Sequence, residues 1–269
     1  MVNALIKILK PFPWFKRFNA KITYELLAKH IPAQDWQFMN YGYVPTADEP
    51  ALHTNYNFTK QVYPLQMYHY LALHADLNNK QVLEVGSGRG GGARYLAENF
   101  QPKQYIGLDL TQSAVDLANK IHQLPNLKYI QGSAEKLPFP PASQDVVINV
   151  ESCHSYGRVD IFLSEVERVL KPGGYLLLVD FRSEYKMDDF RKLLKETKLT
   201  LLKEEDISQR VIQSIEAENP DKVKRIEELI PKRWQKLFSD FAGVVGSRFY
   251  NTLKDGSRSY YRFVLHKPS

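Results

Sequence analysis

The most informative stretch of the chain is Val82-Leu83-Glu84-Val85-Gly86-Ser87-Gly88-Arg89-Gly90-Gly91-Gly92. Its apolar start is typical of a buried strand, and its end opens a helical pattern. Glycines between the two allow a sharp turn and let the backbone lie against a ligand where a Cβ would collide. The spacing also satisfies the dinucleotide fingerprint, in which a pyrophosphate lies on the helix amino terminus. The loop therefore indicates a nucleoside-containing ligand and leaves its identity open.

Short apolar runs alternate with helical patterns from Gln81 onward. We expect strands at Gln81–Val85, Gln104–Leu108, Leu127–Gln131, Asp145–Val150 and Tyr175–Asp180. We expect helices near Gly91–Asn99, Gln112–His122 and Asp160–Val169. This alternation is typical of an α/β fold with a parallel, doubly wound, Rossmann-like sheet, whose strands are buried between two helical layers.

The pattern changes after Asp180 to charged, helix-forming stretches at Asp188–Lys198 and Pro220–Phe241. Two further strands are expected at Ser247–Leu253 and Ser259–His266, because the Asp255-Gly256 pair between them suits a tight hairpin turn. The expected organisation is a helical amino-terminal extension with a lid (1–76), a cofactor-binding core (77–185), a helical cap (186–246) and a closing antiparallel hairpin (247–269).

Composition is ordinary for a globular protein: of 269 residues, 43% are hydrophobic and 25% are charged. Cys153 is the single cysteine, which excludes an internal disulfide and a cysteine-cage metal site, so we expect no metal and a cytoplasmic location. The net charge of +6 is spread along the chain, and no dedicated nucleic-acid-binding motif accompanies it. We therefore expect no nucleic-acid partner, and the oligomeric state stays open.

The first eighteen residues mix apolar and aromatic side chains with lysines and an arginine. One interpretation is a helix whose apolar face caps the protein's own core. The other is a basic, aromatic segment that lies in a membrane interface and makes the protein peripheral at a membrane surface. No stretch approaches the ~20 apolar residues needed to span a bilayer.

Two motifs downstream of the glycine loop narrow the choice of ligand. Asp109 ends the second expected strand, where nicotinamide enzymes and methyltransferases both place a carboxylate for ribose hydroxyls. Pro172 stops a helix, and Gly173-Gly174 allow the reversal into the next strand. With the segment Gly132–Phe139 and the strand Asp145–Val150, this set resembles the class I S-adenosylmethionine-dependent methyltransferase family from Val82 to Asp180.

The resemblance implies S-adenosylmethionine as the cofactor and assigns residues to it. The methionine end would lie on the glycine loop, the ribose on Asp109, and the adenine among residues 110 and 133–135. Glu135 has an alternative as a solvated loop carboxylate. The implied cofactor-binding residues are Glu84, Gly86, Gly88, Asp109, Leu110, Ser133, Ala134, Glu135, Asn149 and Glu151.

The segment Asn149–Tyr156 follows the fourth expected strand, where doubly wound folds bind their ligands. His154 is the candidate general base for a hydroxyl acceptor, with a structural histidine as the alternative. Together with Asn40–Tyr43 and Asp180–Arg182, this segment is similar to the phthiotriol/phenolphthiotriol dimycocerosates methyltransferase group. That similarity implies a hydroxylated lipid or polyketide-like acceptor, with Tyr41 and Tyr43 closing over the sulfonium by cation–π attraction or simply packing.

Two other functions stay open at this point. A sterol-like C-methyltransferase would act on an alkene and would surround a cationic intermediate with acidic and aromatic residues, for which Glu49, Glu151 and the loop tyrosines are candidates. A non-catalytic protein that binds S-adenosylmethionine is the alternative from another class. The intact glycine loop and Asp109 favour an enzyme.

Overall fold

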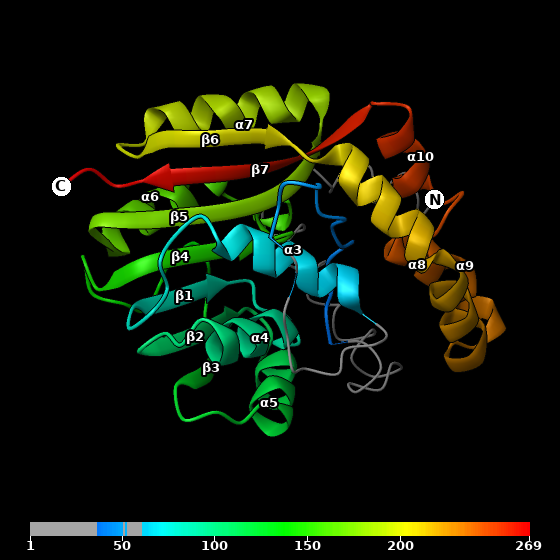
Figure 1. The fold of residues 1–269 in the computed structure, drawn as a ribbon, viewed down its shortest axis with the longest axis horizontal. Helices are drawn as coiled ribbons and strands as arrows, with labels where there is room; N and C mark the ends of the chain where they lie inside the picture. The colour runs from blue at the N-terminus through cyan, green and yellow to red at the C-terminus, as the bar shows by residue number, and fades with distance from the viewer. Residues whose placement is uncertain (1–36, 51, 53–60) are drawn as a thin grey trace, which may run out of the picture.

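The computed structural model describes residues 37–50, 52 and 61–269, which contain a seven-stranded sheet between layers of helices (Figure 1). The strands are β1 (Gln81–Val85), β2 (Gln104–Asp109), β3 (Leu127–Gln131), β4 (Gln144–Val150), β5 (Leu170–Ser183), β6 (Thr200–Asp206) and β7 (Arg258–His266). Their order across the sheet is β3-β2-β1-β4-β5-β7-β6. The first five strands are parallel, and β7 runs antiparallel between β5 and β6.

The strand order reverses beside β1, which pairs with β2 on one side and β4 on the other. The chain leaves β1 toward one edge of the sheet and returns to continue toward the opposite edge. The loops that follow these strands therefore diverge at their carboxyl ends, and in open α/β sheets the resulting crevice is where ligands bind.

Helices cover both faces of the sheet. They are α3 (Val62–Ala72), α4 (Gly91–Asn99), α5 (Gln112–Ile121), α6 (Val159–Val169), α7 (Glu184–Glu196), α8 (Ser208–Leu229), α9 (Lys232–Ala242) and α10 (Arg248–Lys254). Buried residues of α3, α4 and α5 share one core with the sheet, whereas those of α6 and α7 share another. Because side chains alternate along a strand, β4 sends Ile148 into the first core and Val147 into the second. The predicted doubly wound sheet is confirmed.

A helical group lies beyond the carboxyl ends of the parallel strands, on the right of Figure 1. In it α8 and α9 pack through a small separate core that includes Ile226, Ile230 and Phe238. The stretch Pro220–Phe241 is helical as expected, but it is divided between two helices. Pro220 lies inside α8 without ending it, and the break comes at Pro231, which caps α9.

The predicted closing hairpin is wrong. Its first strand, Ser247–Leu253, is the helix α10, which the Ser247 side chain caps by accepting a hydrogen bond from the Tyr250 N–H at 3.2 Å. The partner of β7 at the outer side is instead β6, which the sequence analysis did not predict. As the edge strand, β6 keeps most of its side chains in contact with water, so it lacks the apolar pattern by which strands are recognised.

Helix α7 and strand β6 belong to the sheet domain. Met187, Phe190 and Leu194 of α7 pack into the same core as Phe263 of β7. The stretch expected as a helical cap from residue 186 onward therefore begins with elements that complete the sheet, and α8 and α9 are the helices that extend past it.

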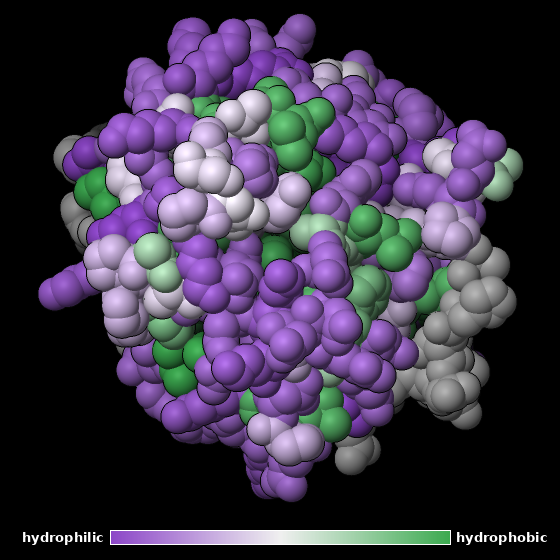
Figure 2. Space-filling view, turned by 60° about the vertical axis from the view of Figure 1, so that its left-hand side comes forward, coloured by the Kyte–Doolittle hydropathy of each residue, from purple (hydrophilic) through white to green (hydrophobic). Residues whose placement is uncertain are grey.

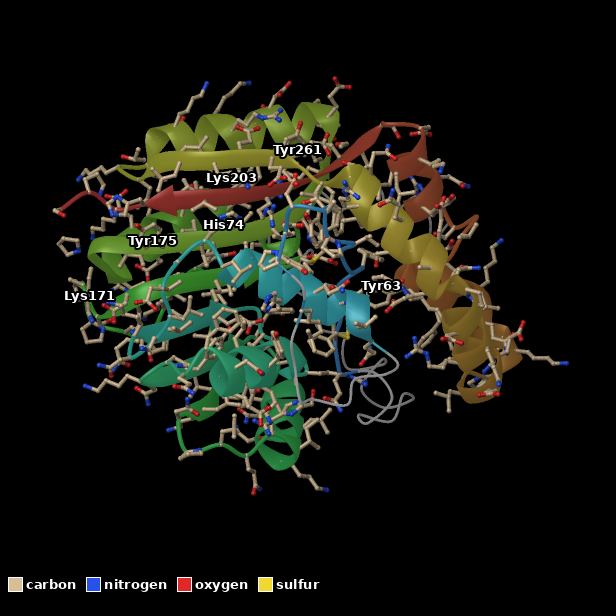
Figure 3. All side chains as sticks on the ribbon, in the orientation of Figure 1. Tyr63, His74, Lys171, Tyr175, Lys203 and Tyr261 are labelled. Atoms are coloured by element: carbon tan, nitrogen blue, oxygen red, sulfur yellow. The ribbon has the colours of Figure 1, made fainter. Side chains whose placement is uncertain are left out.

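The segment around residues 41–44 is fastened between α3 and α8. The Tyr43 N–H donates to the Tyr63 carbonyl at 3.0 Å, and the Ser214 hydroxyl donates to the Tyr41 carbonyl at 2.9 Å. Tyr63 stands at the start of α3, between that helix and α8 (Figure 3). At Gly42 a Cβ would lie 2.2 Å from the Ser214 Oγ, and φ is +82°, so this position requires glycine. The segment predicted as a lid from its aromatic residues is thus held firmly against α3 and α8 at residues 41–43.

The face at which the parallel strands begin is largely hydrophilic, with apolar side chains scattered over it (Figure 2). Within the described residues, no helix combines the length and the apolar character needed to cross a bilayer. The segment 1–18, for which both a packing helix and a membrane contact were considered, lies outside the described residues.

Candidate functional site

A cleft lies at the carboxyl ends of β1, β2 and β4 and holds about 1030 Å³ of empty space, open to solvent on one side. The loops after these strands form its floor, and residues 37–40 with Tyr68 of α3 form its opposite wall. Of the implied cofactor-binding residues, the structure brings eight to this cleft: Gly86, Gly88, Asp109, Leu110, Ser133, Ala134, Glu135 and Glu151. This size suits a nucleoside-sized ligand.

The glycine loop turns because three of its residues, Gly86, Gly88 and Gly90, have left-handed backbone conformations. Gly86 has φ +83°, and a Cβ there would lie 2.4 Å from the Ser152 Oγ, so a side chain cannot be accommodated. The Gly86 N–H donates to the Leu108 carbonyl at 2.7 Å, which joins the ends of β1 and β2. The loop backbone consequently stays close to the cleft with no side chain in between.

Asp109 is held in one orientation by three hydrogen bonds. Its Oδ2 accepts from the Gly88 N–H at 2.9 Å, and its Oδ1 accepts from the backbone N–H and the hydroxyl of Thr111 at 2.9 and 2.8 Å. A carboxylate has about four lone-pair sites, two on each oxygen, so Oδ1 is fully used and Oδ2 keeps one site for a hydroxyl in the cleft. This arrangement suits a ribose hydroxyl.

Charge in the cleft discriminates between the two candidate ligands. Among its described lining residues are three carboxyl groups, those of Asp109, Glu135 and Glu151, and no lysine or arginine. A pyrophosphate would meet unfavourable potential here, whereas a ligand with a sulfonium and an ammonium group would be attracted. The site therefore fits S-adenosylmethionine and disfavours a nicotinamide dinucleotide.

The methionine contact implied for Glu84 is corrected by the structure. Glu84 is fully buried behind the loop, and its two carboxyl oxygens accept hydrogen bonds from the hydroxyls of Tyr68 at 2.7 Å and Tyr105 at 2.9 Å. Burial raises the pKa of Glu84 to about 7, although these two hydrogen bonds act in the opposite direction. Glu84 thus joins α3, β1 and β2 behind the glycine loop and does not line the cleft.

Replacement of Glu84 by glutamine should flatten the pH dependence of stability. Because the pKa of Glu84 is higher in the folded protein than in the unfolded chain, its contribution is complete below pH 4.5 and is lost as pH rises through 7. The shift corresponds to roughly 3 kcal/mol. Urea unfolding at pH 5 and pH 8 measures it: the wild type should lose stability between the two pH values by more than the Glu84→Gln variant does. The exposed Glu98→Gln change is the control, and equal pH slopes in all three proteins would contradict the assignment.

Asn149 also lies outside the cleft, contrary to the implied cofactor contact. Its side-chain amide donates to the Val85 carbonyl at 2.8 Å and to the Ser152 hydroxyl at 2.8 Å. It therefore ties the loop after β4 to the end of β1. Glu151 does line the cleft, with φ +48°, and its Oε1 accepts from the Tyr41 N–H at 2.7 Å. Burial raises the pKa of Glu151 to about 8.

The structure separates the two tyrosines predicted to close over the sulfonium. Tyr43 is 1% exposed in the core, where its hydroxyl donates to Glu49 at 2.7 Å, so its predicted role at the cofactor is wrong. Tyr41 lies next to Glu151, but its ring stacks on Phe249 at 3.9 Å between centroids and its hydroxyl donates to the Phe241 carbonyl at 3.0 Å. Tyr41 thus contributes its backbone to the site, while its ring packs against α9 and α10.

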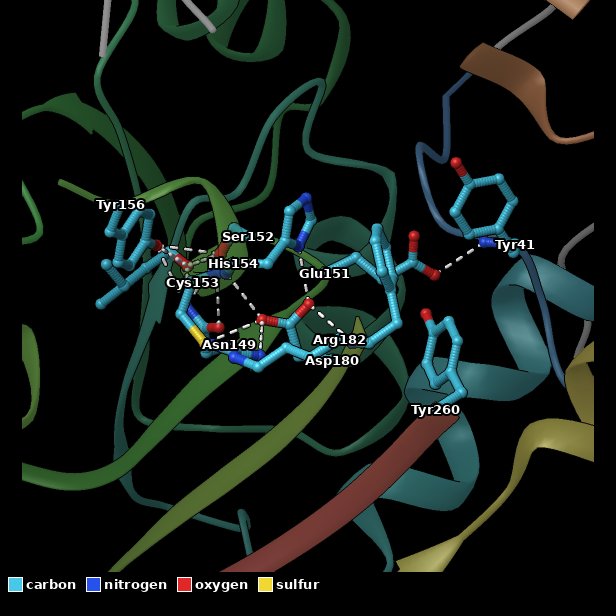
Figure 4. Close-up of polar contacts among 12 residues, drawn as sticks. Tyr41, Asn149, Glu151, Ser152, Cys153, His154, Tyr156, Asp180, Arg182 and Tyr260 are labelled. Atoms are coloured by element: carbon cyan, nitrogen blue, oxygen red, sulfur yellow. Dashed lines mark hydrogen bonds and ion pairs between the residues drawn. The ribbon is translucent and has the colours of Figure 1, made fainter. Parts of the chain in front are cut away.

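His154 forms a closely oriented pair with Asp180, as the dashed lines in Figure 4 show. Its Nδ1 lies 2.7 Å from the Asp180 Oδ1, and its backbone N–H donates to the Oδ2 at 2.7 Å. With the proton on Nδ1, the other ring nitrogen is left as an acceptor, and the side chain is 27% exposed. His154 itself does not line the cleft, but its neighbours Glu151, Ser152 and Ser155 do.

The sequence predicts no separate role for Asp180, although Asp180–Arg182 carries part of the family resemblance. Burial acts to raise the pKa of Asp180, but electrostatic attraction to His154 and Arg182 and the hydrogen bonds from His154 and Cys153 hold that pKa far below its usual range. Arg182 donates to the Asp180 Oδ2 at 2.9 Å and to the Cys153 Sγ at 3.1 Å. Burial raises the pKa of Cys153 well above its ordinary value, which agrees with a buried, unreactive thiol. The sequence signal for the Asp180–Arg182 ion pair is an Asp-x-Arg at the end of a buried strand.

Comparison with known proteins agrees with this geometry. Residues 83–178 match the family described as "Methyltransferase domain". The chain is 34% identical to a fatty-acid O-methyltransferase from Mycolicibacterium smegmatis, over 99% of this chain and 98% of the relative. It is 33% identical to a phthiotriol/phenolphthiotriol dimycocerosates methyltransferase from Mycobacterium leprae, over 92% and 91% of the two chains. Among solved structures, the cyclase SpnF shares the fold, with a TM-score of 0.70 at 19% identity over 93% of this chain and 95% of that one.

Proposed function

The chain belongs to the S-adenosylmethionine-dependent methyltransferase family, and we propose that it transfers the methyl group to a hydroxyl oxygen of a lipid. The cofactor supplies an activated methyl group, so the protein has to align the acceptor, exclude water and take up the acceptor's proton. The observation that carries the choice of a hydroxyl is the pairing of His154 with Asp180.

The lipid part of the proposal is supported by the curated relatives. One of them is named a fatty-acid O-methyltransferase and another a phthiotriol/phenolphthiotriol dimycocerosates methyltransferase, and each relative matches more than nine-tenths of this chain. That length includes α8 and α9, which lie beyond the carboxyl ends of the parallel strands.

The His154–Asp180 pair supports a hydroxyl because an alcohol must lose its proton as the new oxygen–carbon bond forms. Asp180 holds the Nδ1 proton and thereby the tautomer in which the second ring nitrogen accepts. The bound cofactor would supply the methyl carbon, with its carbon–sulfur bond breaking as the oxygen–carbon bond forms, and the second ring nitrogen of His154 would take up the hydroxyl proton. Arg182 keeps Asp180 ionised throughout, since it neutralises the buried carboxylate.

The alternative of alkene methylation loses one of its acidic candidates. Glu49 accepts from Tyr43 and forms an ion pair with Arg262 at 3.3 Å, in the core beside β7. It is therefore committed to a structural ion pair and cannot stabilise a cation in the cleft. Glu151 is left as the acidic group of that hypothesis, and burial favours its neutral form.

The acceptor group is testable with a matched set of C16 lipids. Purified protein would be incubated with methyl-labelled S-adenosylmethionine and hexadecan-1-ol, hexadecanoate or hexadec-1-ene, and the products would be identified by mass spectrometry. The methyl ether of the alcohol is the expected product. Methylation of hexadecanoate alone would reject the hydroxyl and leave a lipid carboxyl oxygen as the target. A branched hydrocarbon would reject oxygen methylation altogether.

A further inference from the structure

Helix α9 has one side that packs against the protein and another that faces solvent. Phe238 and Ala242 are buried in the small core that α9 shares with α8. Trp234 and Leu237 are 38% and 56% exposed, although both are large apolar side chains. Residues three apart on a helix lie on the same side, so these two side chains form one apolar ridge on the surface. We call Trp234 and Leu237 the α9 ridge.

Basic side chains flank the α9 ridge. Lys232, Arg233 and Lys236 are exposed, and Asp240 is the one acidic residue of the helix. None of the three cations forms an ion pair within the part of the chain that the structure describes. The Arg233 guanidinium lies 5.8 Å from the centroid of the Trp234 ring. The exposed side of α9 therefore combines an apolar ridge with a net positive charge.

Met39 connects α9 with the cofactor cleft. Its side chain lines the cleft and also packs against the core of α8 and α9. Both helices lie beyond the carboxyl ends of the parallel strands, the end of the sheet at which the cleft is found (Figure 1). The α9 ridge and the cleft therefore belong to the same end of the molecule.

The chemistry of this surface fits an anionic membrane better than a protein. Tryptophan and leucine beside lysine and arginine are typical of a helix that lies in the interface of an anionic bilayer. Lysine is depleted at protein–protein interfaces, whereas acidic lipids attract it. A second copy of this chain is also disfavoured, because a symmetric dimer would bring the like charges of two ridges together.

We propose that the α9 ridge binds the surface of an anionic membrane, with its two apolar side chains in the interface and Lys232, Arg233 and Lys236 at the lipid phosphates. This contact would hold the end of the protein that carries the cleft near lipid, which agrees with a lipid acceptor. Membrane binding is measured without turnover, so its outcome is separate from that of the proposed function.

Vesicle sedimentation with the full chain tests the proposal. Wild type should bind vesicles of equal phosphatidylglycerol and phosphatidylcholine and should bind phosphatidylcholine alone much more weakly. Trp234→Ala/Leu237→Ala should lower the partition coefficient by about tenfold or more, because less apolar surface enters the interface. Lys232→Gln/Lys236→Gln should lower it by roughly tenfold to thirtyfold, since each basic residue near an anionic surface contributes about fivefold.

The sheet domain offers a matched control for each double variant. Leu202→Ala shortens an apolar side chain of β6 that is as exposed as Leu237, at 56%. Lys192→Gln/Lys195→Gln removes two exposed charges from α7. Both controls should bind the anionic vesicles nearly as tightly as wild type does.

A dye at residue 237 locates the contact directly. Cys153 is buried, so Leu237→Cys can be labelled selectively with an environment-sensitive dye, and Leu202→Cys is labelled as its control. The fluorescence of the dye should rise with anionic vesicles at residue 237 and stay constant at residue 202.

Three results would overturn the α9 ridge as a membrane contact. The first is wild-type protein that does not bind anionic vesicles, and the second is binding that both α9 double variants retain in full. The third is an unchanged dye signal at residue 237 while the protein sediments with the vesicles. Self-association that Trp234→Ala/Leu237→Ala abolishes, without vesicle binding, would assign the ridge to a dimer instead.

Discussion

The Asp109→Ala variant is expected to lose S-adenosylmethionine binding, with a dissociation constant raised by roughly a hundredfold or more. A ribose hydroxyl would lose a charge-assisted hydrogen bond, worth about 1.5–3 kcal/mol. The same change frees the N–H groups of Gly88 and Thr111, so the loop and the start of α5 lose their common anchor. Isothermal titration with S-adenosylmethionine measures the effect.

Asp116→Ala is the matched control for this experiment. Asp116 is an exposed carboxylate on α5, bonded to Gln112 within the same helix, and lies outside the cleft. The Asp116→Ala variant should bind the cofactor with wild-type affinity. Asp109→Asn, which keeps one acceptor oxygen, should fall between the two. Cofactor affinity in Asp109→Ala that equals the control would remove the ribose site from this position.

The His154→Ala variant is expected to lower kcat for a hydroxylated lipid by about 10²–10⁴-fold, the usual contribution of a general base. Cofactor affinity should be unchanged, because His154 does not line the cleft. Rapid-quench measurement of methyl transfer at saturating cofactor separates the chemical step from binding. Asp180→Asn should also slow the reaction, since an amide no longer selects the Nδ1–H tautomer.

His266→Ala serves as the control for removal of a partly buried histidine. His266 ends β7 and packs against Tyr175, at the opposite end of the sheet from the cleft. The His266→Ala variant should have an unchanged kcat. Because Asp180→Asn leaves Arg182 buried without its counter-charge, thermal unfolding of each variant accompanies the kinetics. Near-normal turnover of His154→Ala with a proven hydroxyl acceptor would show that the histidine is structural.

Prediction from sequence failed for the elements that lack a local signal. In the edge strand β6 apolar and polar residues do not alternate clearly, because most of its side chains face water. Helix α10 contains the β-favouring residues Phe249 and Tyr250, although the Ser247 side chain caps the segment as a helix. Residues whose position follows from the local sequence were easier to predict. Gly86 has a backbone conformation that favours glycine, and Asp109 ends a buried strand.

Side-chain direction is the other information that was missing. Tyr41 and Tyr43 are two residues apart, yet one adjoins Glu151 and the other lies in the core. Glu84 is next to the glycine loop in sequence, but a strand alternates its side chains, and this one turns inward to two tyrosines. Proximity along the chain therefore predicted more residues at the cleft than the structure places there.

Local patterning was sufficient to predict a doubly wound sheet, a glycine loop after its first strand and a carboxylate at the end of the second, because turns and buried strands depend on neighbouring residues. Long-range packing determined the rest. Tyr41 reaches Glu151 across 110 positions, and His154 finds Asp180 across 26. The His154–Asp180 pair exists only where separate parts of the fold meet, since a hydrogen bond depends on distance in space and not along the chain.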